Sequence, residues 1–149
     1  MLGAERFGSL ATGCRMSKTA LIVEDEIFVA LDLERILLDA GYQVAAIAAD
    51  SASALEAAPD CGFAFVDVNL RDGPTGPDIA RRISQEHGIK VVFVTANPTQ
   101  IGDGGDALGY VRKPFSEQAI LAAAAIATTA DAPANDDVVP FDRSSVSFG

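Results

Sequence analysis

Four consecutive apolar residues, 63–66, end at a single carboxylate, Asp67, and this stretch restricts the fold more than any other. An apolar run without polar alternation is typical of a strand buried on both faces, as in a parallel sheet covered by helices. The carboxyl ends of such strands meet at one edge of the sheet, where open α/β folds bind their ligands. The stretch therefore predicts an α/β fold with Asp67 at its functional edge.

Three further apolar segments end in polar side chains: residues 21–23 run into Glu24, Asp25 and Glu26, residues 91–94 into Thr95, and residues 109–111 into Arg112 and Lys113. If these strands are parallel, the acids, the threonine and the lysine gather at the same edge of the sheet as Asp67. This gathering is the basis of the functional interpretation.

Strands and helices are expected to alternate along the chain. The expected strands are residues 19–23, 43–48, 63–66, 90–94 and 108–111, and the expected helices are residues 27–40, 51–58, 77–86 and 116–127. This alternation indicates a doubly wound, five-stranded parallel sheet with right-handed crossovers. Residues 97–106 contain one proline and three glycines, so the fourth helix of the series is expected to be short, frayed or mobile.

The 149 residues are expected to form one domain over residues 18–128, with a flexible extension at 1–17 and a disordered tail at 129–149. Met16, just before the first strand, is an alternative start. We expect no output domain in this tail, because its length is too short for one. No apolar run is long enough for a membrane helix and no secretory signal is evident. Two cysteines without metal spacing fit the reducing cytoplasm.

The net charge of −10 argues against direct binding to nucleic acid, which requires a basic surface, and favours protein partners or a bound cation. A carboxylate such as Asp67 can attack a phosphoryl group and form an acyl phosphate. Glu24, Asp25 and Asp67 supply the oxygen ligands that Mg²⁺ prefers, and Lys113 and Thr95 can contact the phosphoryl oxygens. Each residue alone has an ordinary surface explanation, but all of them at successive strand ends indicate one site.

These motifs, in this order, resemble the receiver domain of two-component response regulators over about residues 18–128. The matching segments are Val23-Glu24-Asp25-Glu26, Phe65-Val66-Asp67, Val94-Thr95-Ala96, Tyr110 and Lys113-Pro114-Phe115. The resemblance implies a flavodoxin-like (CheY-like) fold with strand order 2-1-3-4-5.

The same resemblance implies roles for individual residues. Asp67 is the phosphorylated aspartate, and Mg²⁺ is bound by Glu24, Asp25, Asp67 and the backbone carbonyl of Asn69. Thr95 and Lys113 assist the phosphotransfer, Thr95 and Tyr110 form the switch, and the Lys113–Pro114 peptide bond is cis. Glu24 stands where many receivers carry aspartate, which lengthens one ligand arm but keeps its charge.

Within this family, the acidic triplet and Asn69-Leu70-Arg71-Asp72-Gly73 resemble stress-response receivers of alphaproteobacteria. Residues 93–96 resemble the Phe-Ala-Thr-Gly motif of their single-domain FAT GUY subfamily, from which they depart at Val94 and Ala96. The expected function is therefore that of a single-domain response regulator in a phosphorelay. Its expected partners are sensor histidine kinases and a downstream regulator or phosphotransfer protein. Phosphorylation is expected to switch protein binding through a face formed by residues 97–127.

Two other functions compete with this interpretation. The chain is expected not to be an enzyme beyond supporting its own phosphotransfer and dephosphorylation. A phosphatase of the haloacid-dehalogenase type also uses an aspartate and Mg²⁺, but it carries Asp-x-Asp on its first strand, where this chain has Glu24-Asp25-Glu26. A receiver-like adaptor that never needs phosphate is the second alternative. The single histidine, His87, is interpreted as a helix C-terminal residue rather than a phosphoacceptor.

Overall fold

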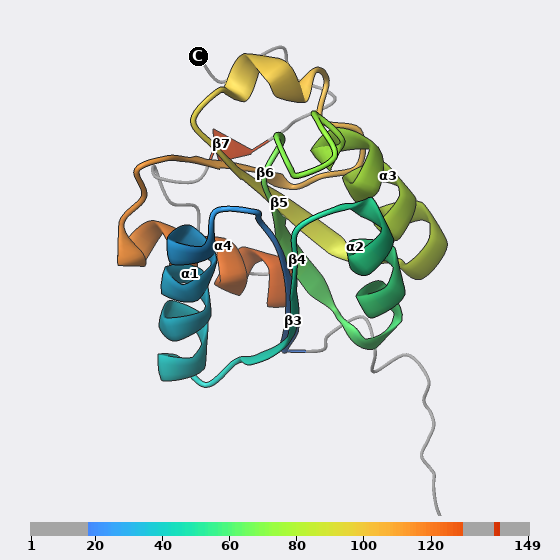
Figure 1. Ribbon diagram of the computed structural model, residues 1–149. Coiled ribbons are helices and arrows are strands. Elements are labelled where there is room, and N and C mark those ends of the chain that lie inside the picture. Colours follow the sequence, from blue (N-terminus) through green and yellow to red (C-terminus); the bar gives the residue numbers. More distant parts are fainter. Residues whose placement is uncertain (1–17, 130–138, 141–149) are drawn as a thin grey trace, which may run out of the picture.

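The computed structural model describes residues 18–129 and 139–140, which form one sheet with helices on both faces (Figure 1). The strands are β2 (Thr19–Val23), β3 (Gln43–Ala48), β4 (Phe63–Val66), β5 (Lys90–Thr95), β6 (Gly109–Arg112) and β7 (Val139–Pro140). The α-helices are α1 (Ile27–Asp39), α2 (Ser51–Ala57), α3 (Gly76–His87) and α4 (Glu117–Thr128), and two 3₁₀ helices are η2 (Ala58–Asp60) and η3 (Pro98–Ile101).

The strands lie in the order β3-β2-β4-β5-β6-β7, and the first five are parallel to one another. Numbered along the chain, these five strands have the predicted order 2-1-3-4-5, so the prediction of a flavodoxin-like sheet is confirmed. β4 lies between β2 and β5, and each of its four residues is at most 1% exposed. Its unbroken apolar run is explained by this position, because both of its faces are covered.

Helices α1 and α4 cover one face of the sheet, and α2 and α3 cover the other (Figure 1). Their ends follow from local chemistry. The Asp50 carboxylate accepts a hydrogen bond from the Ser53 N–H at 3.0 Å, and the Ser116 hydroxyl accepts one from the Ala119 N–H at 3.1 Å. Both are N-caps that satisfy amides left unpaired in the first helical turn. Gly88 ends α3 with a φ of +68°.

The connection between β5 and β6 contains no α-helix. Its only helical turn is η3, which begins with Pro98 and ends at Gly102, a residue with φ +78° and ψ −136°. Gly104 and Gly105 also have positive φ values. Proline starts a helix but these glycine conformations cannot continue one, so the expected weak fourth helix shortens to a single 3₁₀ turn. Its mobility stays a prediction.

The second half of the chain contributes one element that was not expected. Residues 129–149 were predicted to be disordered, but Val139 and Pro140 form β7, which pairs antiparallel with β6. A proline is tolerated here because β7 is an edge strand. The predicted extension at 1–17 and the rest of the tail beyond Thr129 lie outside the described residues. No helix among the described residues is both long and apolar enough to cross a lipid bilayer.

Candidate functional site

Four parallel strands end side by side at the carboxyl edge of the sheet, and a polar side chain stands at or just after each end. The Lys113 ammonium nitrogen, Nζ, lies 2.9 Å from Glu24 Oε1 and 2.9 Å from Asp67 Oδ2. It also lies 3.0 Å from Glu26 Oε1. The structure thus brings together three predicted residues and one further acid, and a single ammonium is shared by three carboxylates.

The backbone holds these side chains in place because the sheet hydrogen bonds continue past the strand ends. The N–H groups of Glu24, Asp67 and Lys113 donate to carbonyl groups of the neighbouring strands β3, β2 and β5 at 2.8, 2.9 and 3.0 Å. Adjacent parallel strands lie about 4.8 Å apart, so side chains fixed at these ends are within contact of one another. The Lys113–Pro114 peptide bond is cis, as the resemblance implied.

Asp67 is a nearly buried carboxylate with two different partners. Its side chain Oδ1 accepts a hydrogen bond from the Val68 N–H at 2.7 Å, and its Oδ2 accepts one from Lys113 at 2.9 Å. The residue is 7% exposed. The start of α3 closes in behind it: a Cβ on Gly76 would lie 2.0 Å from the Asp67 carbonyl oxygen. Only glycine permits this approach of α3 to the end of β4.

Glu24 is the most deeply buried acid of the site, at 2% exposed. Burial and, to a smaller extent, the neighbouring Asp67 charge raise its pKa to about 7, although the Lys113 ammonium and the Glu26 N–H oppose the shift. Its Oε1 lies at ion-pair distance from Lys113 but has no hydrogen bond of good geometry. Burial alone would lower the pKa of Lys113, but its hydrogen bond to Asp67 and its ion pair with Glu24 raise that pKa above the usual value.

The acids of this edge are suited to a divalent cation. Glu24, Glu26 and Asp67 each offer a carboxylate oxygen, and these three atoms lie within 4.8 Å of one another. Oxygen ligands are those that Mg²⁺ prefers, and the incompletely bonded Glu24 Oε1 is a further acceptor at this position. The described residues therefore fit the predicted metal.

The group of acids contains one residue that was not predicted and lacks one that was, and the role of Asp25 as a metal ligand stays a prediction. Asp25, predicted as a ligand, is exposed and does not belong to the group, whereas Glu26 does. The reason is the turn before α1, in which the Glu26 N–H donates to Glu24 Oε2 at 3.1 Å. This bond folds residue 26 back over the end of β2. The unbroken acidic triplet in the sequence indicated that acids gather here, but the sequence alone does not indicate which of the three side chains turn toward the site.

The remaining predicted residues lie around this group. Thr95 is 1% exposed, and its hydroxyl oxygen accepts a hydrogen bond from the Asn97 N–H at 3.0 Å, which leaves the hydroxyl hydrogen available for another acceptor. Tyr110 is half-buried on β6 and packs against the core between the sheet and α3. The side chain of Asn69 is exposed and donates to Gln100 Oε1 at 2.9 Å. No feature of the sequence pointed to Gln100.

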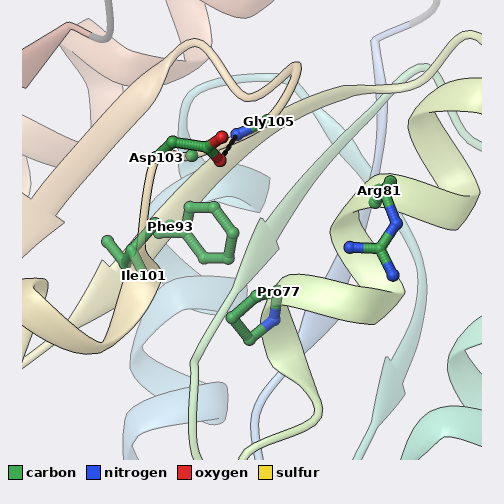
Figure 2. Close-up of a pocket in the computed structure, with 7 residues that line it drawn as sticks. Pro77, Arg81, Phe93, Ile101, Asp103 and Gly105 are labelled. Atoms are coloured by element: carbon green, nitrogen blue, oxygen red, sulfur yellow. Dashed lines mark hydrogen bonds between the residues drawn. The ribbon is translucent and has the colours of Figure 1, made fainter.

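A separate cavity of about 220 Å³ lies on the α3 side of the sheet, beside the β5–β6 connection (Figure 2). It is lined by Pro77, Arg81, Phe93, Ile101, Asp103, Gly104 and Gly105. The Asp103 carboxylate accepts a hydrogen bond from the Gly105 N–H at 2.9 Å, so the loop is closed on itself at the rim (Figure 2). None of the clustered acids lines this cavity.

Comparison with known proteins agrees with this geometry. The family model described as the response regulator receiver domain matches residues 20–125. Among curated proteins, the phyllosphere-induced regulator PhyR of Methylorubrum extorquens is 30% identical over 105 residues, which are 67% of this chain and 39% of that protein. The chain therefore spans well under half the length of this relative.

Two solved structures are also similar. The PhyR receiver domain of Erythrobacter litoralis superposes with a TM-score of 0.69 and 31% identity, over 74% of this chain and 89% of that one. An anti-anti-sigma factor PhyR variant from Bartonella quintana gives 0.61 and 29%, over 74% of this chain and 47% of that one. The sheet order, the acidic edge with its lysine and the match over residues 20–125 lead to one conclusion: this chain belongs to the response regulator receiver domain family.

Proposed function

We propose that the chain is a phosphorylation-dependent response regulator in which Asp67 accepts a phosphoryl group from a sensor histidine kinase. The observation that carries this proposal is the buried Asp67 carboxylate, 2.9 Å from the Lys113 ammonium and beside two further acids. An Asp67 oxygen attacks phosphorus, the new P–O bond forms an acyl phosphate, and the bond from phosphorus to the kinase histidine breaks. The kinase histidine, protonated on its other ring nitrogen, keeps the electron pair of the broken P–N bond and leaves as a neutral imidazole.

The residues around Asp67 supply what this transfer requires. Lys113 lies close enough to contact the incoming phosphoryl oxygens, and Thr95 has a hydroxyl hydrogen to donate to them. Glu24, Glu26 and Asp67 would hold Mg²⁺, which supplies positive charge against the charge of the phosphoryl group when it is bound. The chain turns over no external substrate in this mechanism, because the phosphoryl group stays on Asp67 until water removes it.

The switch is proposed to run from Thr95 to Tyr110. When the Thr95 hydroxyl moves toward the phosphoryl oxygens, the space it leaves accepts the Tyr110 side chain. This changes the face formed by η3, β6 and α4, which binds the downstream partner. The phosphoryl group shifts the population only as far as its contacts favour one conformation over the other. Similarity to PhyR supports a place in a stress-response phosphorelay.

Phosphorylation by a small-molecule donor tests the chemistry. Wild-type protein incubated with phosphoramidate and Mg²⁺ should gain the mass of one phosphoryl group, and hydroxylamine should remove it, as it does acyl phosphates. Asp67→Asn should gain none. Asp103→Asn, which removes a carboxylate outside the acidic group, is the matched control and should behave as wild type. Equal phosphorylation of Asp67→Asn would contradict the assignment, and no phosphorylation of any variant would favour the adaptor alternative.

The kinase is proposed to dock on the first turns of α1. Phe28 is 84% exposed and Leu31 45% exposed, and both follow Glu26 at the mouth of the site. Exposed large apolar side chains beside a reaction centre are typical anchors for a protein partner. Phe28→Ser should lower phosphotransfer from the kinase about tenfold or more and leave the reaction with phosphoramidate unchanged. Leu38→Ser, at the far end of α1 and 50% exposed, is the control; equal effects of the two would exclude this docking site.

A further inference from the structure

The outer edge of β6 is the position at which the parallel sheet ends. β6 is the last parallel strand, and without another partner its outward N–H and C=O groups would remain unpaired. In this structure β7 covers part of that edge (Figure 1). β6 has four residues, but β7 pairs with only two of them, Gly109 and Tyr110. The edge is therefore only half covered by β7.

The pairing between β7 and β6 is short and therefore weak. It consists of Gly109 opposite Pro140 and Tyr110 opposite Val139. Pro140 has no backbone N–H, so Val139 is the one residue of β7 that can donate a backbone hydrogen bond. A strand of two residues contributes little free energy of its own. The paired and unpaired states of β7 therefore differ little in free energy. A small change in β6 is enough to alter the population of the paired state.

That partner residue is also the proposed switch residue. Tyr110 lies between Phe93 of β5 on one side and Val139 of β7 on the other. Two residues further along β6, Arg112 is in register with Thr95. Both pairs of β7 depend on the backbone at residues 109 and 110. A movement of Tyr110 would therefore act on the whole β7 contact, and no second contact of β7 with β6 is present in the described part of the chain to hold it.

We propose that β7 holds the proposed switch in the conformation described here by pairing with the outer edge of β6. β7 leaves this edge when Tyr110 moves inward. The proposal rests on the proposed function, because it takes phosphorylation of Asp67 as the event that moves Tyr110.

Coupling between β7 and the switch is reciprocal, so it can be measured on the chain alone. If β7 pairs more strongly with β6 in the conformation described here than in the phosphorylated one, then a substitution that weakens this pairing must favour the phosphorylated conformation. It must also favour binding of any ligand selective for that conformation. Val139→Pro removes the single backbone donor of β7. In the full-length chain with Mg²⁺, this variant should bind beryllofluoride, a phosphoryl mimic, about two- to tenfold more tightly than wild type, which corresponds to the net contribution of about one hydrogen bond. Val146→Pro, elsewhere in the tail, is the control and should bind as wild type.

Amide NMR of the wild-type chain supplies the second measurement. On addition of Mg²⁺ and beryllofluoride, the amide signals of Gly109, Tyr110 and Val139 should all move, and the Val139 signal should approach the position typical of a valine amide in an unstructured chain. Movement of the Thr95 and Lys113 signals with no change at Val139, together with equal affinities of the proline variants, would overturn this inference and leave the proposed function intact. No response at any residue would overturn both. A dimer that forms through the tail would also overturn the intramolecular pairing proposed here.

Discussion

The two faces of the sheet are covered unequally. On one face, α1 and α4 supply 13 and 12 residues of α-helix, and their side chains pack with Phe63 and Phe65 of β4 in one buried cluster. On the other face, α2 has seven residues, α3 has 12, and the β5–β6 connection adds only the four-residue η3. The cavity of about 220 Å³ lies on this second face, between α3 and that connection.

The difference separates the parts that hold the site from the parts proposed to respond to it. Glu24, Asp67 and Lys113 are fixed by sheet hydrogen bonds that both faces support. The proposed switch residues, Thr95 and Tyr110, flank the connection that lacks an α-helix. Regions with few buried contacts open at lower free energy than the rest of a domain. We therefore expect the second face to be the more easily displaced, and four predictions test this expectation.

The largest expected difference comes from shortening one buried isoleucine on each face. Ile120 of α4 is fully buried, and Ile101 of η3 is 5% exposed and already borders the cavity. Ile120→Ala should lower the free energy of unfolding by about 4 kcal/mol and Ile101→Ala by about 2 kcal/mol, because a loop relaxes around a lost side chain more readily than a packed helix does. Urea denaturation measures both. Equal losses would mean that the two faces are equally rigid.

The next effect is a dependence of folding stability on pH, and it arises at the carboxyl edge of the sheet, which both faces share. Folding raises the pKa of Glu24 from 4.5 to about 7, so the folded chain holds this proton more tightly than the unfolded chain does. In metal-free buffer, stability should therefore fall as pH rises from about 4.5 to about 7, by up to about 3 kcal/mol. Glu24→Gln should remove this decrease. Glu56→Gln, on the exposed side of α2, is the control, and a wild-type profile that stays flat would refute the prediction.

A smaller effect is expected from exchanging alanine and glycine between the two regions. Gly102 has φ +78° and ψ −136°, with no atom within 4 Å of an added Cβ, so its only obstacle to alanine is conformational. Gly102→Ala should cost about 1–2 kcal/mol. Ala122→Gly in α4 should cost about 1 kcal/mol for the opposite reason, the entropy of the unfolded chain. Stabilisation by Gly102→Ala, measured by thermal unfolding, would show that this connection can form a longer helix.

The smallest effect concerns the amide pair that ties η3 to the loop after β4. The exposed hydrogen bond from Asn69 to Gln100 contributes about 0.5 kcal/mol, so Gln100→Ala should barely change global stability. It should nevertheless speed amide hydrogen exchange in residues 97–101 several-fold and leave α4 unchanged. Thr99→Ala, a neighbouring exposed substitution, is the control. Faster exchange in α4 as well would mean that the two faces open together.

Much of the fold was predictable because local patterns reflect burial directly. The unbroken apolar run of β4 predicted a central strand, and Ser116 and Gly88 marked helix ends through their own hydrogen bonding and backbone conformation. The glycines and Pro98 predicted that the fourth helix would be weak. The two-residue β7 was not predictable, since a pair of residues has no periodicity and its pairing with β6 depends on where the chain returns in space.

The candidate site, like the fold, has features that the sequence predicts and features that it does not. The sequence by itself determined that Glu24, Asp67, Thr95 and Lys113 stand at the ends of neighbouring strands, because strand order and alternation set backbone positions. Only the tertiary structure decided that Glu26 rather than Asp25 joins the acids, that Glu24 is buried enough to retain a proton near neutral pH, and that Asn69 contacts Gln100. These outcomes depend on side-chain direction and on water excluded by packing, which no local pattern of residues encodes.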